Sequence, residues 1–267
     1  MAIQGGYLLP GAALLQGDDT GFFETYKGIV ETNTGKSAAY VKLLPKKALA
    51  NELVCTVLGQ AAGLPVPDGY LVQVSIEDYP SSRFLLGQEL THTLAYGSVD
   101  LNSPSLARKF SADNVAFDTL LSSWSRWNEA LLFDEWVSNG DRHPGNFLIR
   151  SPDDVWLIDH SHAFRGPNWY LMDLVPHSPN RNLIAEHAGR FLKLPERKEL
   201  LDSAEKIKAE YELLTLSRIF DESRAAHLLS EPDISAMKNF LAGRLKLLAG
   251  LVARRVGIPR FPTMTEA

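Results

Sequence analysis

The hydrophobic pattern of the chain changes near residue 91, and this change constrains the fold more than any single motif. Before it, short stretches such as "FFETYKGIV" and "YLVQVSI" are rich in aromatic and β-branched residues and are separated by turn formers, which is typical of strands. After it, "NVAFDTLLSSWSRWNEALLFDEWV" and residues 183–255 are helical in pattern. The chain therefore predicts an α+β protein with a β-rich part, residues 1–90, and a larger, mainly helical part, residues 91–267.

The β-rich part contains one predicted helix. Apolar residues recur at helical spacing from Lys47 to Ala62, and Gly63 is typical of a helix end. Ahead of this helix, "ETNTGK" predicts a hairpin turn before the strand "SAAYVKLL". The overlapping letters "TNTGKS" resemble the end of a phosphate-binding P-loop, but Val30 stands where that motif needs its first glycine. We therefore interpret this segment as a hairpin tip.

Composition excludes several classes of function. A net charge of −5 offers no basic field for nucleic acid or anionic lipid. The single cysteine, Cys55, allows neither an internal disulfide nor a Cys-rich metal site, and its apolar neighbours predict a buried, unreactive thiol. Signal-peptide features are missing from the N-terminus, and no run approaches the ~18 apolar residues of a membrane span. We expect a cytoplasmic protein.

The loop within "WVSNGDRHPGNFLIR", residues 136–150, holds more polar groups than a turn requires. Turn chemistry explains its glycines, its proline and one asparagine, but not an acid and an amide five positions apart, Asp141 and Asn146. Phosphoryl transfer needs a few oxygen ligands for Mg²⁺ and a separate carboxylate that orients the acceptor hydroxyl. The D-x-x-x-x-N spacing is that of kinase catalytic loops. The loop therefore predicts a phosphotransferase in which Asp141 faces the acceptor.

A second acid follows the loop at a suitable place. The stretch "NFLIRSPDDVWLIDH" predicts a hairpin with strands at 147–150 and 155–158. This hairpin returns Asp159 to a position beside Asn146, so that both side chains can bind Mg²⁺.

The β-rich part supplies a cation. Lys42 lies in a predicted strand, and Glu52 lies ten residues further on in the predicted helix, where the two can pair. Kinases use this arrangement to hold the α- and β-phosphates of ATP. Each residue alone is ordinary, but their order, followed by Asp141, Asn146 and Asp159, favours a kinase-like protein.

At this point the chain resembles the HipA-like kinase family, in its compact standalone form. The resemblance rests on "NGDRHPGN" followed by "VWLIDHSHAF", on "AAYVK" and on "ALANELVCTVLGQAAGLPVPDG", and it extends from about residue 20 to 255. It implies a bilobal protein-kinase-like fold, ATP with Mg²⁺, and phosphate transfer to a protein serine or threonine. It also raises the expectation of a toxin–antitoxin role, with an antitoxin or regulatory protein as partner.

The resemblance assigns roles to single residues. It implies Asp141 as catalytic base, Asn146 and Asp159 as metal ligands, and Lys42 as the phosphate-binding lysine. The further positions that it implies at the nucleotide are Gly17 and Gly21 in the candidate phosphate loop "GDDTG", and Gln88, Glu89 and Leu90 in the hinge. The family's serine-rich phosphate-loop signature is not found, and the acids of "GDDTG" would repel a polyphosphate. Because "DHS" replaces the D-F-G of ordinary kinases, no phenylalanine-driven switch is expected.

Several neighbouring residues are interpreted as structural. Arg142 is expected to pair with a carboxylate and brace the loop, and His143 to hydrogen-bond near Asp159. His160 and His162 lack a suitably spaced soft ligand for zinc. The residues expected in the helical core are Trp124, Trp127, Trp136 and Trp169, and Asp233 is expected to cap the last helix.

Three other functions remain open. The same fold can phosphorylate a small molecule or a lipid, in which case residues 165–185 are expected to form the wall of a closed acceptor pocket. It can also transfer AMP and release pyrophosphate. Finally, the chain can bind ATP without turnover, although the presence of all five polar residues argues against this.

Overall fold

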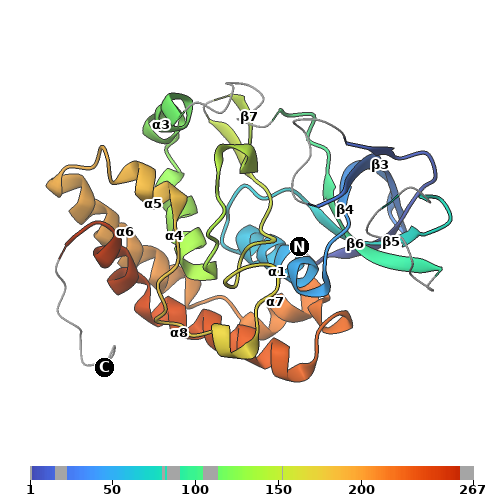
Figure 1. Cartoon of the computed structure of the whole chain (residues 1–267). Helices are drawn as coiled ribbons and strands as arrows, with labels where there is room; N and C mark the ends of the chain where they lie inside the picture. Colours follow the sequence, from blue (N-terminus) through green and yellow to red (C-terminus); the bar gives the residue numbers. More distant parts are fainter. Residues whose placement is uncertain are drawn as a thin grey trace.

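The computed structural model describes residues 2–15, 23–79, 82, 91–104, 114–151 and 153–258. A β-rich part lies beside a larger helical part (Figure 1). This mixed α+β architecture agrees with the sequence prediction. The positions expected at the nucleotide in "GDDTG" and at Gln88, Glu89 and Leu90 lie outside the described residues.

Six strands among the described residues of the β-rich part form one sheet that closes on itself. These strands are β1 (Gln4–Leu8), β2 (Ala13–Leu14), β3 (Thr25–Thr32), β4 (Gly35–Lys42), β5 (Gly69–Ser75) and β6 (His92–Val99). The order is β1-β5-β6-β4-β3-β2, and β1 also pairs with β3, so the sheet curls into a small barrel (Figure 1). Alternate residues of β4, such as Ala39 and Val41, fill its interior with Tyr26 and Val72.

The hairpin predicted at "ETNTGK" joins β3 to β4 in the structure, with Thr32 opposite Gly35. Gly35 has a φ of 137°, a backbone conformation that glycine adopts without strain. The sheet continues through β6 to Val99 and so extends beyond residue 90, where the sequence analysis placed the join between the two parts.

One helix of the β-rich part, α1 (Lys46–Ala61), lies between the barrel and the helical part. It matches the predicted helix, and Gly63 after it has a positive φ of 73°. Every residue from Ala48 to Gly59 is buried, because β5 and β6 cover one side of the helix and α7 packs on another. Cys55 is buried in this helix as expected, and burial raises the pKa of its thiol.

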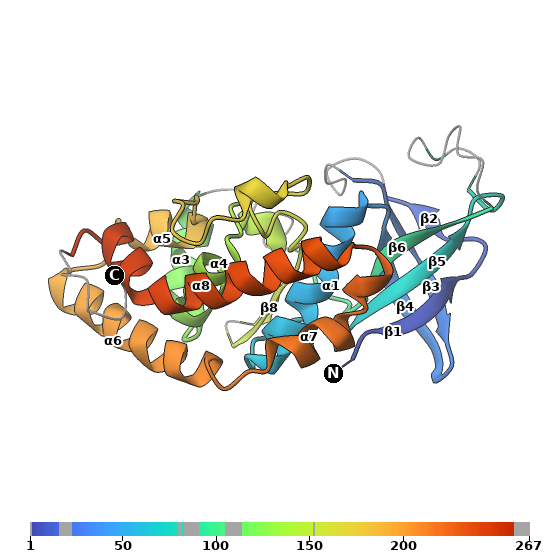
Figure 2. The ribbon, with the colours of Figure 1, turned by 90° about the horizontal axis from the view of Figure 1, so that it is seen from below.

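The helical part surrounds a second small hairpin. Its helices are α3 (Asn114–Ser123), α4 (Trp127–Val137), α5 (Leu183–Ala188), α6 (Leu194–Tyr211), α7 (Leu216–Ser223) and α8 (Glu231–Arg255). Its strands are β7 (Phe147–Ser151) and β8 (Asp154–Leu157), and its 3₁₀ turns are η2 (Pro144–Asn146), η3 (Leu171–Asp173) and η4 (Ala225–His227). The long helix α8 runs along the underside of the molecule and packs on α4 and α6 (Figure 2).

Two details of this part differ from the sequence prediction. The run "NVAFDTLLSSWSRWNEALLFDEWV" forms two helices, because the chain leaves the helical path at Trp124–Arg126. The N-cap of α8 is Ser230, not Asp233: the Ser230 hydroxyl accepts from the Asp233 amide, and Asp233 lies within the first turn. The Ser230 hydroxyl also donates to Asp233 Oδ2 at 2.7 Å, so the acid supports the serine cap from within the first turn.

The predicted tryptophan core is largely confirmed. Trp124, Trp136 and Trp169 are buried, and Trp136 stacks on Tyr211 at 4.8 Å between ring centroids. Trp127 is only half-buried. Among the described helices, none is long and apolar enough to cross a membrane.

Candidate active site

The loop after α4 is organised by one buried guanidinium group. Arg142 and Asp134 are both fully buried. They form a bidentate ion pair, with distances of 3.0 Å (Nε–Oδ2) and 3.1 Å (Nη2–Oδ1). Arg142 Nη1 also donates to the carbonyl oxygens of Asn146, at 3.1 Å, and Ile158. The expectation that Arg142 pairs with a carboxylate and braces the loop is therefore confirmed. A single side chain ties the loop to the end of β8.

The acid and the amide of the loop are held by hydrogen bonds to its backbone. Asn146 is buried, and its Nδ2 donates to the carbonyl oxygen of Asp141 at 2.7 Å, which fixes the orientation of the amide. The Asn139 side chain accepts from the Asp141 amide at 3.2 Å. The Asp141 carboxylate itself is 42% exposed, so it can receive a group from solvent.

The second hairpin returns Asp159 to this loop. β7 and β8 pair with Phe147 opposite Leu157, and the Ile158 amide donates to the carbonyl oxygen of Asn146 at 3.1 Å. Asp159 has a φ of 60°, an unusual value for a residue with a side chain. Its Oδ1 accepts from the Ser161 hydroxyl at 2.7 Å. Asp159 therefore directly follows a residue whose backbone is hydrogen-bonded to Asn146, and the hairpin predicted from the sequence is present.

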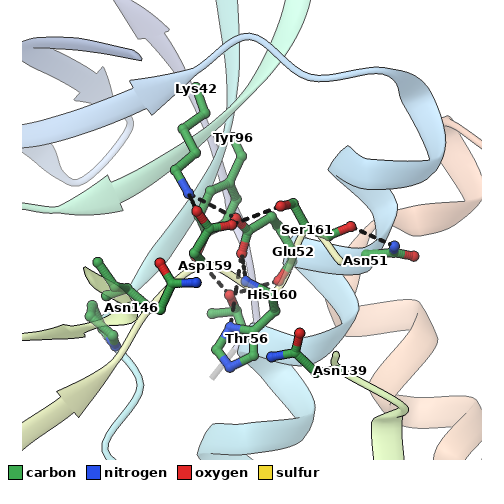
Figure 3. Close-up of polar contacts among 12 residues, drawn as sticks. Lys42, Asn51, Glu52, Thr56, Tyr96, Asn139, Asn146, Asp159, His160 and Ser161 are labelled. Atoms are coloured by element: carbon green, nitrogen blue, oxygen red, sulfur yellow. Dashed lines mark hydrogen bonds and ion pairs between the residues drawn. The ribbon is translucent and has the colours of Figure 1, made fainter. Parts of the chain in front are cut away.

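Lys42 joins the two parts of the molecule. Its Nζ lies 2.7 Å from Asp159 Oδ2 and 3.3 Å from Glu52 Oε1, so one ammonium group contacts two carboxylates (Figure 3). Glu52 is fully buried, and its other oxygen accepts from the His160 amide at 2.8 Å. Figure 3 shows the side chains of Lys42, Asp159 and Asn146 directed into one region between the barrel and the hairpin.

The ionisable groups of Lys42, Glu52 and Asp159 shift one another's pKa values. Burial disfavours the ammonium of Lys42, but the two carboxylates outweigh burial and raise its pKa. Burial raises the pKa of Glu52 to about 7, against the opposing influence of Lys42. Burial acts in the same sense on Asp159, but the close Lys42 prevails and holds its pKa well below the usual range. Of the two carboxyl groups beside Lys42, Asp159 is therefore the one that stays ionised.

The histidines are not arranged as a zinc site. His143 lies beside Asp141, with 4.0 Å between Nε2 and Oδ2, and its Nδ1 accepts from the Gly145 amide. The expectation that His143 bonds near Asp159 is therefore wrong, because its ring caps the turn η2 instead. His160 is buried, and burial lowers its pKa, so its ring is neutral. Over the described ranges, no three His, Cys, Asp or Glu side chains gather around a possible metal position.

Several supporting side chains of the site were not predicted from the sequence. Asp134 is an acid inside the apolar run "EALLFDEWV", which is a detectable signal of a buried charged partner. Asn51 directly precedes Glu52 in a helix that is otherwise apolar on nearly all sides, and it is fully buried. Ser161 gives no such signal, because a serine after a strand is common.

One family model matches the part of the chain that carries these residues. The family model described as "HipA-like kinase" matches residues 35–187, which is more than half of the chain and includes Lys42, Glu52, Asp141, Asn146 and Asp159. The chain belongs to the HipA-like kinase family. Membership of this family supports a phosphotransferase. No curated protein matches this HipA-like kinase.

Two solved structures are similar to this chain at low sequence identity. The proinflammatory kinase CtkA of Helicobacter pylori is 14% identical, with 92% of this chain and 96% of that chain covered and a TM-score of 0.57. HipA of Shewanella oneidensis MR-1, from a toxin–antitoxin complex with HipB and operator DNA, is 13% identical, with 94% and 67% covered and a TM-score of 0.47. The likeness to CtkA supports the mixed α+β fold of this HipA-like kinase.

Proposed function

We propose that this HipA-like kinase transfers the γ-phosphate of ATP to a serine or threonine of another protein, with Mg²⁺ as cofactor. The observation that carries the proposal is the position of Lys42 Nζ, within 3.3 Å of Glu52 and 2.7 Å of Asp159. A barrel strand, a buried helix and a hairpin each contribute one of these residues. Phosphoryl transfer requires this combination of a fixed cation and an ionised metal ligand.

The residues present fit a magnesium ion. Asp159 stays charged, because Lys42 lowers its pKa, and the Asn146 amide has a fixed orientation, because its Nδ2 donates to Asp141. A carboxylate and an amide oxygen are ligands that Mg²⁺ accepts while it keeps several waters. When bound, the ion supplies positive charge to the phosphate oxygens that leave with ADP. Asp159 and Asn146 are therefore the proposed ligands.

The remaining residues orient the two reactants. Lys42 presents its ammonium to the α- and β-phosphates, and Glu52 keeps the lysine in place from within the protein. We assign Asp141 to accept the hydroxyl proton of the acceptor, since its carboxylate is exposed and its backbone carbonyl binds the Asn146 amide. We assign the nucleotide as ATP, with adenine as its base, on the family resemblance.

We place the acceptor side at the segment after Asp159. Its turn η3 exposes Tyr170, Leu171 and Met172, with exposed fractions of 68%, 50% and 81%. Exposed apolar side chains on an ordered turn suit contact with a polypeptide better than with a phosphorylated metabolite. This observation favours a protein acceptor over a small molecule, and a protein partner such as an antitoxin is compatible with it.

The test uses purified protein, Mg²⁺ and ATP labelled at either the γ or the α position, incubated with a cell lysate. Asp159→Ala serves as the inactive control, and Asp202→Ala, at an exposed position of α6, serves as a matched acidic control. The proposal predicts γ-label on protein that Asp159→Ala abolishes and Asp202→Ala retains. The γ-labelled bands then identify the acceptor.

Other outcomes overturn parts of the proposal. Label only from the α position shows AMP transfer and rejects kinase chemistry. Release of ADP without labelled protein, at the same rate with and without lysate protein, redirects the acceptor to a small molecule. No turnover while ATP still binds identifies a binding protein.

A further inference from the structure

One buried amide joins α1 to the segment that follows Asp159. Asn51 is fully buried, and its Nδ2 lies 2.9, 2.8 and 3.1 Å from the carbonyl oxygens of Ser161, Ala163 and Gly166. Its Oδ1 accepts from the indole nitrogen of Trp169 at 3.0 Å. The contact of this side chain with Ser161 is visible in Figure 3. Both the nitrogen and the oxygen of the Asn51 amide therefore hydrogen-bond to one segment, residues 161–169.

The neighbours of Asn51 on α1 hold the same segment at its two ends. Glu52 accepts from the His160 amide at 2.8 Å. Lys47, one turn earlier, donates to the carbonyl oxygen of Trp169 at 2.6 Å and lies over the Trp169 ring, 4.3 Å from its centroid. Residues on one side of a helix thus fix residues 160–169 along their whole length.

This segment has a backbone that needs external support. Asp159, Phe164 and Arg165 have φ values of 60°, 54° and 77°, in the left-handed region that residues with side chains rarely adopt. Conformations of this kind persist where surrounding contacts fix them, and they cluster at functional sites. The three carbonyl groups that Asn51 binds lie between and beside these residues. Asn51 therefore contacts the segment where its conformation is least favourable.

We propose that Asn51 is a positioning residue, which keeps residues 160–169 in the conformation that directs the Asp159 carboxylate toward Lys42. This inference rests on the proposed role of Asp159 as a metal ligand. Asn51 lies next to Glu52, so the same turn of α1 fixes the partner of Lys42 and the segment that carries Asp159. A shift of α1 would disturb both contacts together.

The test combines a structural and a functional measurement. Hydrogen–deuterium exchange of peptides that cover residues 160–169 is compared between the wild type and Asn51→Ala, without nucleotide. The Mg²⁺ concentration that gives half-maximal ATP turnover is measured in parallel. Removal of a residue that orients a metal ligand typically weakens metal binding by about 10- to 100-fold. We expect faster exchange in the segment and a rise of that size in the Mg²⁺ requirement.

A matched pair of variants covers the case in which Asn51→Ala does not fold. Trp169→Phe removes the indole donor that orients the Asn51 amide, together with part of the buried ring. Trp136→Phe removes a similarly buried indole, whose nitrogen donates to the carbonyl oxygen of Leu241 at 2.9 Å, so the loss of ring volume is matched. We expect Trp169→Phe to raise the Mg²⁺ requirement and the exchange rate, to a smaller extent than Asn51→Ala. Trp136→Phe should lower thermal stability without either effect.

The outcomes separate the two proposals. Equal exchange and equal Mg²⁺ requirement in Trp169→Phe and Trp136→Phe would show that Asn51 is only a core residue and overturn the inference. If instead Asp159→Ala retains full turnover, the proposed function fails, and the exchange rates alone then decide whether Asn51 fixes the segment.

Discussion

Replacement of Asp134 by asparagine tests whether Arg142 organises the catalytic loop. The substitution keeps the shape of the side chain and removes its charge, which leaves the guanidinium group buried without a counter-charge. Arg142 and Asp134 both have a side-chain exposure of 0%, so bulk solvent does not screen the unpaired charge. Breaking a buried ion pair by removal of one partner costs about 3–5 kcal/mol.

The expected change is large enough to measure by unfolding. At ~2–4 °C per kcal/mol for chains of this approximate size, the melting temperature of Asp134→Asn should fall by roughly 6–20 °C. Urea denaturation followed by circular dichroism gives the free energy of unfolding independently, provided that the transition is two-state. A loss below about 1 kcal/mol would contradict the reasoning, since that is the scale of an exposed pair.

A double variant separates stability from function. Burial raises the pKa of Asp134 although Arg142 opposes it, which indicates that desolvation weighs heavily on this pair. Apolar residues of similar volume, as in Asp134→Leu with Arg142→Met, should therefore recover much of the lost stability. Turnover should stay low, because Arg142 also binds the carbonyl oxygens of Asn146 and Ile158. Recovery of activity together with stability would show that the guanidinium group has no positioning role.

Two further predictions address the cation and the acceptor. Burial raises the pKa of Glu52 to about 7, and Lys42, Asp159 and the His160 amide surround its carboxyl group. The Glu52 carboxylate holds Lys42 only when it is charged, so ATP turnover should decline as the pH falls through about 7. Glu52→Gln should lower turnover at pH 8 and flatten this decline. An unchanged pH profile of turnover in the variant would contradict the role of Glu52. Met172→Glu should raise the KM for the protein acceptor by several fold with an unchanged KM for ATP, and equal changes in both would place the turn η3 outside the acceptor surface.

The parts of the site that sequence could predict are those set by local spacing. A loop with an acid and an amide five apart, followed by a short hairpin, leaves little freedom for Asp159, and the structure has that hairpin. The helix that carries Glu52 was predictable for the same reason, since its apolar repeat is continuous. By contrast, the barrel closes because β1 pairs with both β5 and β3, and no local pattern specifies such distant partners.

The errors have equally local causes. Asp233 and Ser230 are both good N-cap residues, and the choice follows from the Ser-x-x-Asp spacing. His143 was expected near Asp159, but its ring nitrogen accepts from Gly145, two residues away, and a contact this close in sequence forms at little entropic cost. A polar side chain beside a tight turn should therefore be considered first as part of that turn.

The helix α1 explains why residues from both parts form one site. The helix α1 is buried on nearly every side and packs on both parts of the molecule. Its buried polar residues must therefore find partners inside the protein. The helix has three buried polar residues, and each has such a partner. Glu52 contacts Lys42, Asn51 contacts the segment after Asp159, and Thr56 contacts the hydroxyl of Tyr96 at 2.7 Å. Because Lys42 and Tyr96 come from paired strands of the barrel and Asp159 comes from the helical part, the polar residues of α1 fix the position of one part against the other. The distance between Lys42 and Asp159 is therefore set by this helix, and substitutions on its buried polar face should disturb the site more than substitutions of equal size elsewhere in the core.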